Sequence, residues 1–82
     1  MTKEAIFLKL QEILAGEFEL DAQSVTLESR LYEDLELDSI DAVDLMVKMK
    51  EYVREKIEPE QFKKARTIQD VVDLLYPLVQ QS

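Results

Sequence analysis

Residues 38–54 read DSIDAVDLMVKMKEYVR, and the apolar positions in this stretch recur at the spacing of an amphipathic helix. Placed at about 100° per residue, most of them fall on one face. These core candidates are Ala42, Leu45, Met46, Met49, Tyr52 and Val53. Asp38 is a typical N-cap, and Asp41 follows three residues later as in a capping box. The stretch therefore predicts a helix from Ser39 to about Arg54.

The same stretch has a second apolar face, about 180° from the first. It consists of Ile40, Val43 and Val47. Carboxylates flank it at Asp41, Asp44 and Glu51. Exposed apolar side chains ringed by charge often mark a surface that binds a partner. In the other interpretation, the chain between residues 17 and 37 covers this face and the three side chains belong to the core. The pattern alone leaves both interpretations open.

The chain before this helix predicts a first helix and then a long loop. Thr2 can cap the first helix. Its apolar residues recur at helical spacing at Ile6, Phe7, Leu10, Ile13 and Leu14. Gly16, the only glycine, stands where a helix C-cap is expected. Residues 17–37 carry apolar side chains too scattered for one helix, which predicts an ordered loop pinned to the core.

The last part of the chain predicts a helix with a marked beginning and end. Thr67 can cap it, with Asp70 three residues later. Its apolar residues are Ile68, Val71, Val72 and Leu75. Pro77 lacks a backbone donor, so it should end or kink the helix near Tyr76.

A short third helix should precede this one, because Pro59 suits a first helical turn and the pattern stops near Lys64 or Ala65. A composition with 46% apolar residues, one Gly and two Pro fits a packed helical protein. The expected fold is all-α, a small four-helix bundle of three main helices and one short helix. A long loop joins the first two helices, and residues 1–82 are expected to form a single domain.

The charge and the missing residue types limit the function. The formal net charge is -8, so nucleic acids and anionic membranes should repel the chain, and partners should present basic patches. Excess acid also raises solubility, so charge alone decides little. Without Cys or His, the chain has no thiol or imidazole for catalysis and no thiolate or imidazole ligand for a metal ion. No apolar run approaches the roughly 20 residues that span a bilayer, which predicts no membrane insertion and a cytoplasmic location.

Ser39 is the first residue after the predicted cap, at the exposed beginning of the helix. A phosphate on its hydroxyl would lie at the positive end of the helix dipole, where an anion is stabilised. The same position also suits an ordinary small polar residue of a first turn. Position alone does not distinguish these roles.

The segment Asp34–Leu45, DLELDSIDAVDL, resembles the attachment motif of acyl carrier proteins. The resemblance extends to the helix order, the long loop, the acidity and the final capping segment. It implies that a phosphopantetheinyl transferase attaches 4'-phosphopantetheine from coenzyme A to Ser39, with Asp38 as the adjacent motif residue. The arm would supply the thiol that the chain lacks and carry acyl groups as thioesters, and the chain itself would not be an enzyme.

The resemblance also assigns a docking face. Its residues match the recognition helix of the family at Ile40, Asp41, Val43, Asp44 and Val47. The implied partners are the transferase, a ketosynthase and other acyl-processing or acyl-transfer enzymes of fatty acid or polyketide synthesis. The carrier is expected to act as a monomer.

Some residues depart from the family pattern. Many relatives have Gly, and Ala or a second Gly, where this chain has Glu36 and Leu37. Lys48 and Lys50 add positive charge to a helix that is usually more uniformly acidic. These differences favour a dedicated carrier in a specialised lipid or polyketide pathway. Two flexible side chains of the core face could line a shelter for an acyl chain or simply pack, namely Met46 and Met49.

Other classes of protein would share some of these features. A peptidyl or D-alanyl carrier would share the fold and the arm, and an unmodified acidic interaction module would share the stripes and the charge. A calcium-binding loop could begin with the alternating carboxylates Asp34, Glu36 and Asp38. Its sixth and twelfth positions, however, would be Ser39 rather than Gly and Leu45 rather than Glu.

Overall fold

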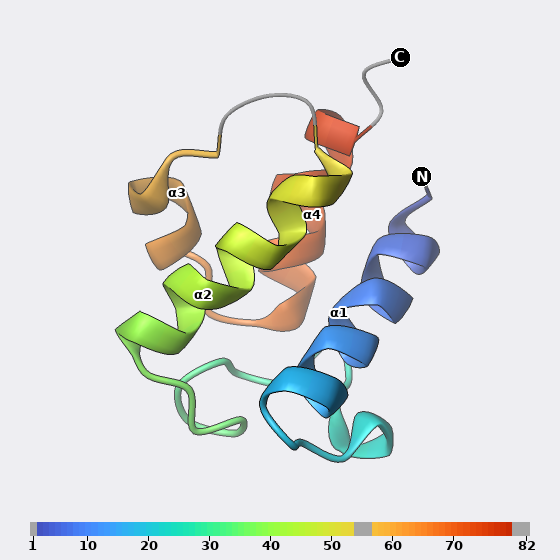
Figure 1. Cartoon of the computed structure of the whole chain (residues 1–82), viewed down its shortest axis with the longest axis vertical. Coiled ribbons are helices and arrows are strands. Elements are labelled where there is room, and N and C mark those ends of the chain that lie inside the picture. The colour runs from blue at the N-terminus through green and yellow to red at the C-terminus, as the bar shows by residue number, and fades with distance from the viewer. Residues whose placement is uncertain (1, 54–56, 80–82) are drawn as a thin grey trace.

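The computed structural model describes residues 2–53 and 57–79. In these residues the chain forms four α-helices and no strand (Figure 1). They are α1 (Lys3–Glu17), α2 (Ser39–Met49), α3 (Pro59–Lys63) and α4 (Ile68–Val79). Short 3₁₀ turns follow α1 and α2, at Ala22–Ser24 and Lys50–Tyr52. The predicted all-α bundle of three main helices and one short helix is confirmed.

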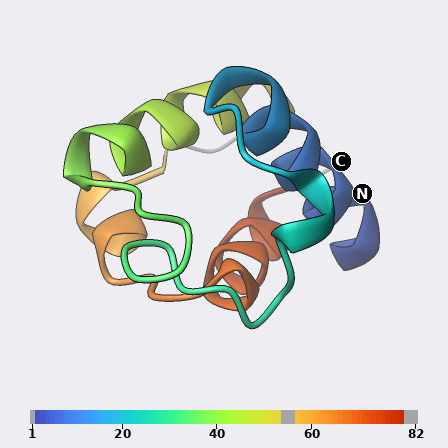
Figure 2. The same ribbon diagram turned by 90° about the horizontal axis from the view of Figure 1, so that it is seen from below.

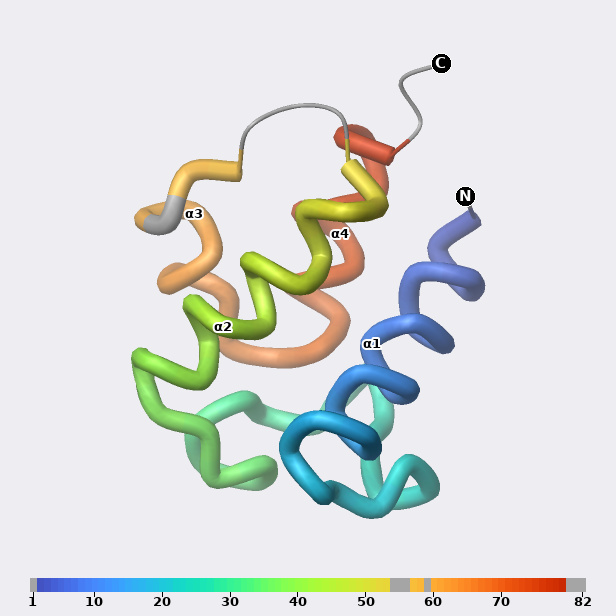
Figure 3. The backbone as a smooth tube through the Cα atoms, in the orientation of Figure 1, coloured from blue at the N-terminus to red at the C-terminus, as the bar shows by residue number. Residues whose placement is uncertain are grey.

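Successive helices alternate in direction. Along the colour gradient, α1 and α3 run one way and α2 and α4 run the other (Figure 3). Seen from below, the four helices surround a common centre (Figure 2). Helix α1 contacts both α4 and α2, and α3 contacts α2 and α4. The fully buried side chains of the core come from all four helices and include Ile6, Leu10, Leu14, Leu45, Met49, Phe62, Ile68, Val71 and Leu75.

The long loop between α1 and α2 is held by its apolar side chains and by its backbone. The buried loop residues are Val25, Leu31, Leu35 and Leu37. The Leu31 amide donates to the Arg66 carbonyl at 2.8 Å, and the Gln69 amide donates to the Leu27 carbonyl at 2.8 Å. These bonds tie the loop to the start of α4, which confirms the prediction of an ordered loop pinned to the core.

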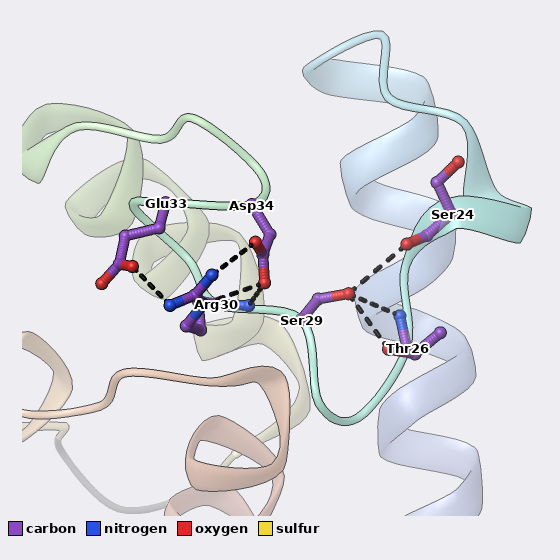
Figure 4. Close-up of polar contacts among 6 residues, drawn as sticks. All are labelled: Ser24, Thr26, Ser29, Arg30, Glu33 and Asp34. Atoms are coloured by element: carbon purple, nitrogen blue, oxygen red, sulfur yellow. Dashed lines mark hydrogen bonds and ion pairs between the residues drawn. The ribbon is translucent and has the colours of Figure 1, made fainter.

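Polar contacts fix the middle of the loop (Figure 4). The buried Ser29 hydroxyl accepts a hydrogen bond from the Thr26 amide at 2.9 Å. The same hydroxyl donates to the Ser24 carbonyl at 3.4 Å. Next to it, Arg30 pairs with Glu33 and with Asp34. The side-chain hydrogen bond from Arg30 lowers the pKa of Asp34 below its usual value. The loop is therefore a defined structural element.

The predicted side-chain N-caps are present. Thr2 accepts from the Ala5 amide at 3.1 Å at the start of α1. Before α4, the Thr67 hydroxyl accepts from the Asp70 amide at 3.2 Å. The Asp70 carboxylate in return accepts from the amides of Arg66 and Thr67, at 3.0 and 3.2 Å. These reciprocal bonds satisfy backbone donors that a helix start leaves unpaired.

The prediction that the second helix reaches Arg54 is wrong. Helix α2 ends at Met49, and the chain tightens into the 3₁₀ turn Lys50–Tyr52. The Lys50 amide is shared between the carbonyls of Met46 and Val47, which is typical of such a tightening. The turn still keeps Tyr52 half-buried, with the Lys9 ammonium 5.3 Å from its ring centroid. Arg54 itself lies outside the described residues.

The predicted C-cap at Gly16 is also wrong. Gly16 lies inside α1, which ends one residue later at Glu17, and Phe18 is the C-cap. The left-handed conformation that often follows a helix is found at Glu19, with φ of 57°. The Leu20 amide donates to the Leu14 carbonyl at 3.2 Å, which holds this reversal in place.

Pro77 does not end α4 near Tyr76, because the helix continues to Val79. A proline keeps a helical φ, although its nitrogen donates no hydrogen bond and its ring crowds the carbonyl four residues earlier. These costs do not end α4 at Tyr76, and only Leu78 and Val79 follow Pro77 in the helix. The short helix α3 ends at Lys63 with Lys64 as its C-cap, which agrees with the prediction.

Candidate functional site

The site is built on the first turn of α2. The Asp38 carboxylate accepts from the Asp41 amide at 2.8 Å, and the Asp41 carboxylate accepts from the Asp38 amide at 3.2 Å. The predicted capping box is therefore complete, with Asp replacing the usual Glu. It fixes where the helix starts and makes Ser39 the first helical residue. The Ser39 side chain is exposed.

Just before the N-cap of α2, Glu36 has an unusual backbone conformation. Its φ of 55° lies in the left-handed region, which costs a residue with a Cβ roughly 1–2 kcal/mol. The buried side chains of Leu35 and Leu37 hold it from both sides, and the Leu37 amide donates to the Leu31 carbonyl at 3.0 Å. The resemblance to acyl carrier proteins predicts Gly at this position, and a positive φ is a conformation that Gly adopts without steric cost.

The second apolar face of α2 is exposed. The exposed fraction is 76% for Ile40, 50% for Val47 and 36% for Val43. The interpretation in which the loop covers these side chains is therefore wrong. The buried apolar residues of the loop pack into the core, and this face of α2 stays open. Asp44 is exposed beside it and Asp41 is half-buried.

Ser39 and the exposed face of α2 share one open groove of about 540 Å³. The α2 residues that line it are Ser39, Ile40, Asp41, Val43, Asp44 and Val47. The structure thus brings together the serine and all five residues assigned to docking by resemblance, and the acidic N-cap adjoins them. One further lining residue, Lys63, comes from α3. Sequence reasoning missed it, because nothing in the sequence places the end of α3 beside the start of α2.

A lysine modifies the charge of this face. The Lys48 ammonium lies 3.6 Å from a carboxylate oxygen of Glu17 and 4.0 Å from one of Asp44. It therefore links α1 to α2 and partly neutralises Asp44 on the exposed face of α2. Such surface pairs contribute little to stability.

The other serines are poorer sites for modification. Ser29 is only 7% exposed, and its hydroxyl is engaged with Thr26 and Ser24. Ser24 is exposed but lies in a 3₁₀ turn of three residues. Ser82 lies outside the described residues. Within the described part of the chain, only Ser39 combines an exposed hydroxyl with the start of an α-helix.

Two further observations concern ions and membranes. Among the described residues, no group of three or more carboxylates gathers in a way that could hold a metal ion. Asp34, the first position of the hypothetical calcium loop, is paired with Arg30 instead. Within the same residues, no helix has the length and apolar character needed to cross a membrane.

Met46 and Met49 are buried in the core, and their role as lining for an acyl chain stays a prediction.

Comparisons with known proteins agree with this geometry. The family described as "Phosphopantetheine attachment site" matches residues 8–75. Acyl carrier protein 2 of Ralstonia nicotianae is 42% identical over 79 residues, which cover 96% of this chain and 98% of that protein. The acyl carrier protein of Phytoplasma mali is 37% identical over 70 residues, covering 85% and 83%. The crystal structure of an acyl carrier protein from Thermotoga maritima has a TM-score of 0.79 at 30% identity and covers 96% and 92%.

The helical fold and the family match define a class of protein, the carriers that bear a phosphopantetheine arm. Within that class, the chain belongs to the acyl carrier protein family. It is a carrier rather than an enzyme, and its prosthetic group is a covalently attached 4'-phosphopantetheine. The arm supplies a thiol on which acyl groups are carried as thioesters. A phosphopantetheinyl transferase and acyl-processing enzymes are its partners, and the aminoacyl carrier and the unmodified module are not favoured.

Proposed function

We propose that Ser39 carries the phosphopantetheine arm and that residues 1–82 act as one acyl carrier domain. The observation that supports this is the position of the Ser39 hydroxyl. It is exposed, directly follows a complete capping box and lies at the edge of the groove on α2. A phosphodiester at this position would benefit from the positive end of the α2 dipole. The residues present therefore fit the group.

In the attachment reaction, the Ser39 oxygen attacks the phosphorus of coenzyme A that bears the pantetheine unit. A new bond forms between that phosphorus and the serine oxygen, and the pyrophosphate bond breaks to release adenosine 3',5'-bisphosphate. The hydroxyl proton passes to a base of the transferase. This chain contributes the nucleophile and its orientation, because the capping box fixes the turn that holds Ser39.

The exposed face of α2 forms the proposed docking surface, which consists of Ile40, Asp41, Val43, Asp44 and Val47. Its apolar side chains provide contact area, and its carboxylates attract enzymes that present Lys and Arg. Electrostatic steering raises association rates without requiring slow dissociation. A carrier that visits several enzymes, among them a ketosynthase, needs such fast and reversible contacts.

We further propose that the protein acts as a cytoplasmic monomer. A net charge of -8 makes copies of the chain repel one another. Sedimentation velocity at low salt should show one species with the mass of a single chain. A stable dimer at micromolar concentration would contradict this.

The attachment site can be tested by intact-mass measurement. The wild-type protein, Ser39→Ala and Ser24→Ala are incubated with coenzyme A, magnesium and a broad-specificity phosphopantetheinyl transferase. Wild type and Ser24→Ala should each gain one phosphopantetheine, and Ser39→Ala should gain none. Loading of Ser39→Ala, or of none of the three with several transferases, would refute Ser39 as the site.

A further inference from the structure

Lys63 lies in the groove of Ser39, although it comes from a different helix. Because α3 runs opposite to α2, the end of α3 lies beside the first turns of α2 (Figures 1 and 3). Lys63 is the last residue of α3, and its exposed side chain lines the same groove as Ser39. The two residues are 24 positions apart in the sequence, and the antiparallel packing brings them to one groove.

The charges around Ser39 make this lysine significant. The other charged residues that line the groove are Asp41 and Asp44, and Asp38 directly precedes the serine. A phosphodiester on Ser39 would therefore add a negative charge next to three carboxylates. Among the described residues that line the groove, Lys63 is the only cation. Among the ion pairs of the described residues, none includes Lys63, so its ammonium is available to an anion.

We propose that Lys63 binds the phosphate of the arm carried on Ser39 and holds the base of the arm along the groove between α2 and α3. This proposal rests on Ser39 as the attachment site. The flexible four-carbon stem of lysine can bring its ammonium to a phosphate as a point charge. It offsets the repulsion from the neighbouring carboxylates, and exposed pairs of this kind favour the bound state by about two- to fivefold.

A weak hold suits a carrier. When the phosphate end of the arm is held near α3, the thiol end explores a smaller volume. The arm then reaches an enzyme from a narrower range of directions. Because the pair is exposed, an enzyme that docks on α2 can break it without a large cost. Lys63 is therefore a positioning residue for the arm.

The test uses the holo protein and the ³¹P NMR signal of its phosphodiester. Wild type, Lys63→Gln, Lys63→Arg and Lys64→Gln are loaded with phosphopantetheine, and full loading is checked by intact mass. Lys64 is a matched control, because it adjoins Lys63 and carries the same charge but does not line the groove of Ser39. Spectra are recorded from low salt to about 1 M salt, where the Debye length falls to about 3 Å.

The ³¹P shift of wild type and of Lys64→Gln should move with salt as the pair is screened. In Lys63→Gln the shift should differ from wild type at low salt and should hardly move. Lys63→Arg should restore the salt dependence. An identical ³¹P response in wild type and Lys63→Gln would overturn the proposal. A failure of Ser39 to load would instead appear in the mass measurement and would refute the attachment site itself.

Discussion

Two glutamates adopt the backbone conformation that glycine prefers, while the only glycine lies in a helix. Glu19 and Glu36 have φ values of 57° and 55°, and Gly16 is inside α1. Sequence reasoning placed the helix end at Gly16 because glycine is the usual signal for such a position. The positions of the reversals could not be read from residue type, since they are set by buried neighbours such as Leu35 and Leu37.

Replacing Glu36 by glycine should stabilise the protein. The change removes the left-handed strain at φ of 55°, and the relief exceeds the entropy that glycine loses on folding. We expect the free energy of unfolding to rise by about 0.5–1 kcal/mol in urea denaturation. Glu28→Gly is the matched control, because Glu28 is an exposed loop residue without a positive φ, and it should lower stability. A destabilised Glu36→Gly variant would contradict this explanation.

Asp38 has two separable roles, as a helix cap and as the acidic residue next to Ser39. Asp38→Asn keeps an oxygen that can accept from the Asp41 amide, and Asp38→Ala does not. We expect Asp38→Ala to lose about 1 kcal/mol of stability and Asp38→Asn to lose much less. If the negative charge also contributes to attachment, phosphopantetheine loading of Asp38→Asn should slow while its stability is kept. Equal loading rates for Asp38→Asn and wild type would limit Asp38 to capping.

At the scale of the elements, α2 carries both a face of the core and the proposed docking surface. Its two apolar faces could be predicted from the spacing of the residues alone. The pattern could not predict whether the loop covers the second face, because the loop sequence is apolar enough for either arrangement. The structure decides this by the direction of the loop side chains, since Val25 and Leu31 are buried in the core while Ile40 remains exposed.

Reversing one charge on α2 should weaken docking without unfolding the domain. Asp44 is exposed and contacts only Lys48 among the ion pairs of the described residues, so Asp44→Lys should leave the melting temperature nearly unchanged. We expect acyl transfer to a ketosynthase to fall at low salt, on the order of tenfold, because steering is lost. Lys48→Ala is the opposite control and should leave transfer equal or faster. Unchanged transfer by Asp44→Lys at low salt would remove Asp44 from the docking surface.

The start of α4 should give part of the stability a defined pH dependence. Hydrogen bonds from the amides of Arg66 and Thr67 lower the pKa of Asp70 from its usual value of 3.8. The stabilisation is therefore fully present above about pH 5 and is lost as the pH falls past the usual value and through the lowered pKa of the folded state. At neutral pH, Asp70→Ala should cost about 0.5–1 kcal/mol.

Urea denaturation of wild type and Asp70→Ala between pH 7 and pH 2 checks this. Their difference in the free energy of unfolding should stay constant down to about pH 5 and shrink below pH 4. Asp70→Asn serves as the control, since it keeps an acceptor oxygen but has no proton to gain. A difference between wild type and Asp70→Ala that grows on acidification would contradict the assignment.

At the scale of the whole molecule, the order of the helices and their N-terminal starts could be predicted, because they depend on local signals such as Thr67 with Asp70 and Pro59. The end of α2 could not be predicted, because a 3₁₀ turn forms where Tyr52 packs beside α1. The groove that joins Ser39 to Lys63 was also beyond the sequence, since it depends on how α3 packs against α2. Local pattern therefore predicted the helices, the resemblance to acyl carrier proteins led to the proposal of Ser39, and tertiary packing determined the surroundings of this serine.

The most direct test of the account is the chemical state of Ser39 in protein isolated from the cells that make it. Fragmentation mass spectrometry of the peptide that contains Ser39 reports both the modification and its load. We predict a phosphopantetheine on Ser39 with an acyl group bound as a thioester. An unmodified Ser39, an arm on Ser24 or Ser29, or an aminoacyl load would contradict it.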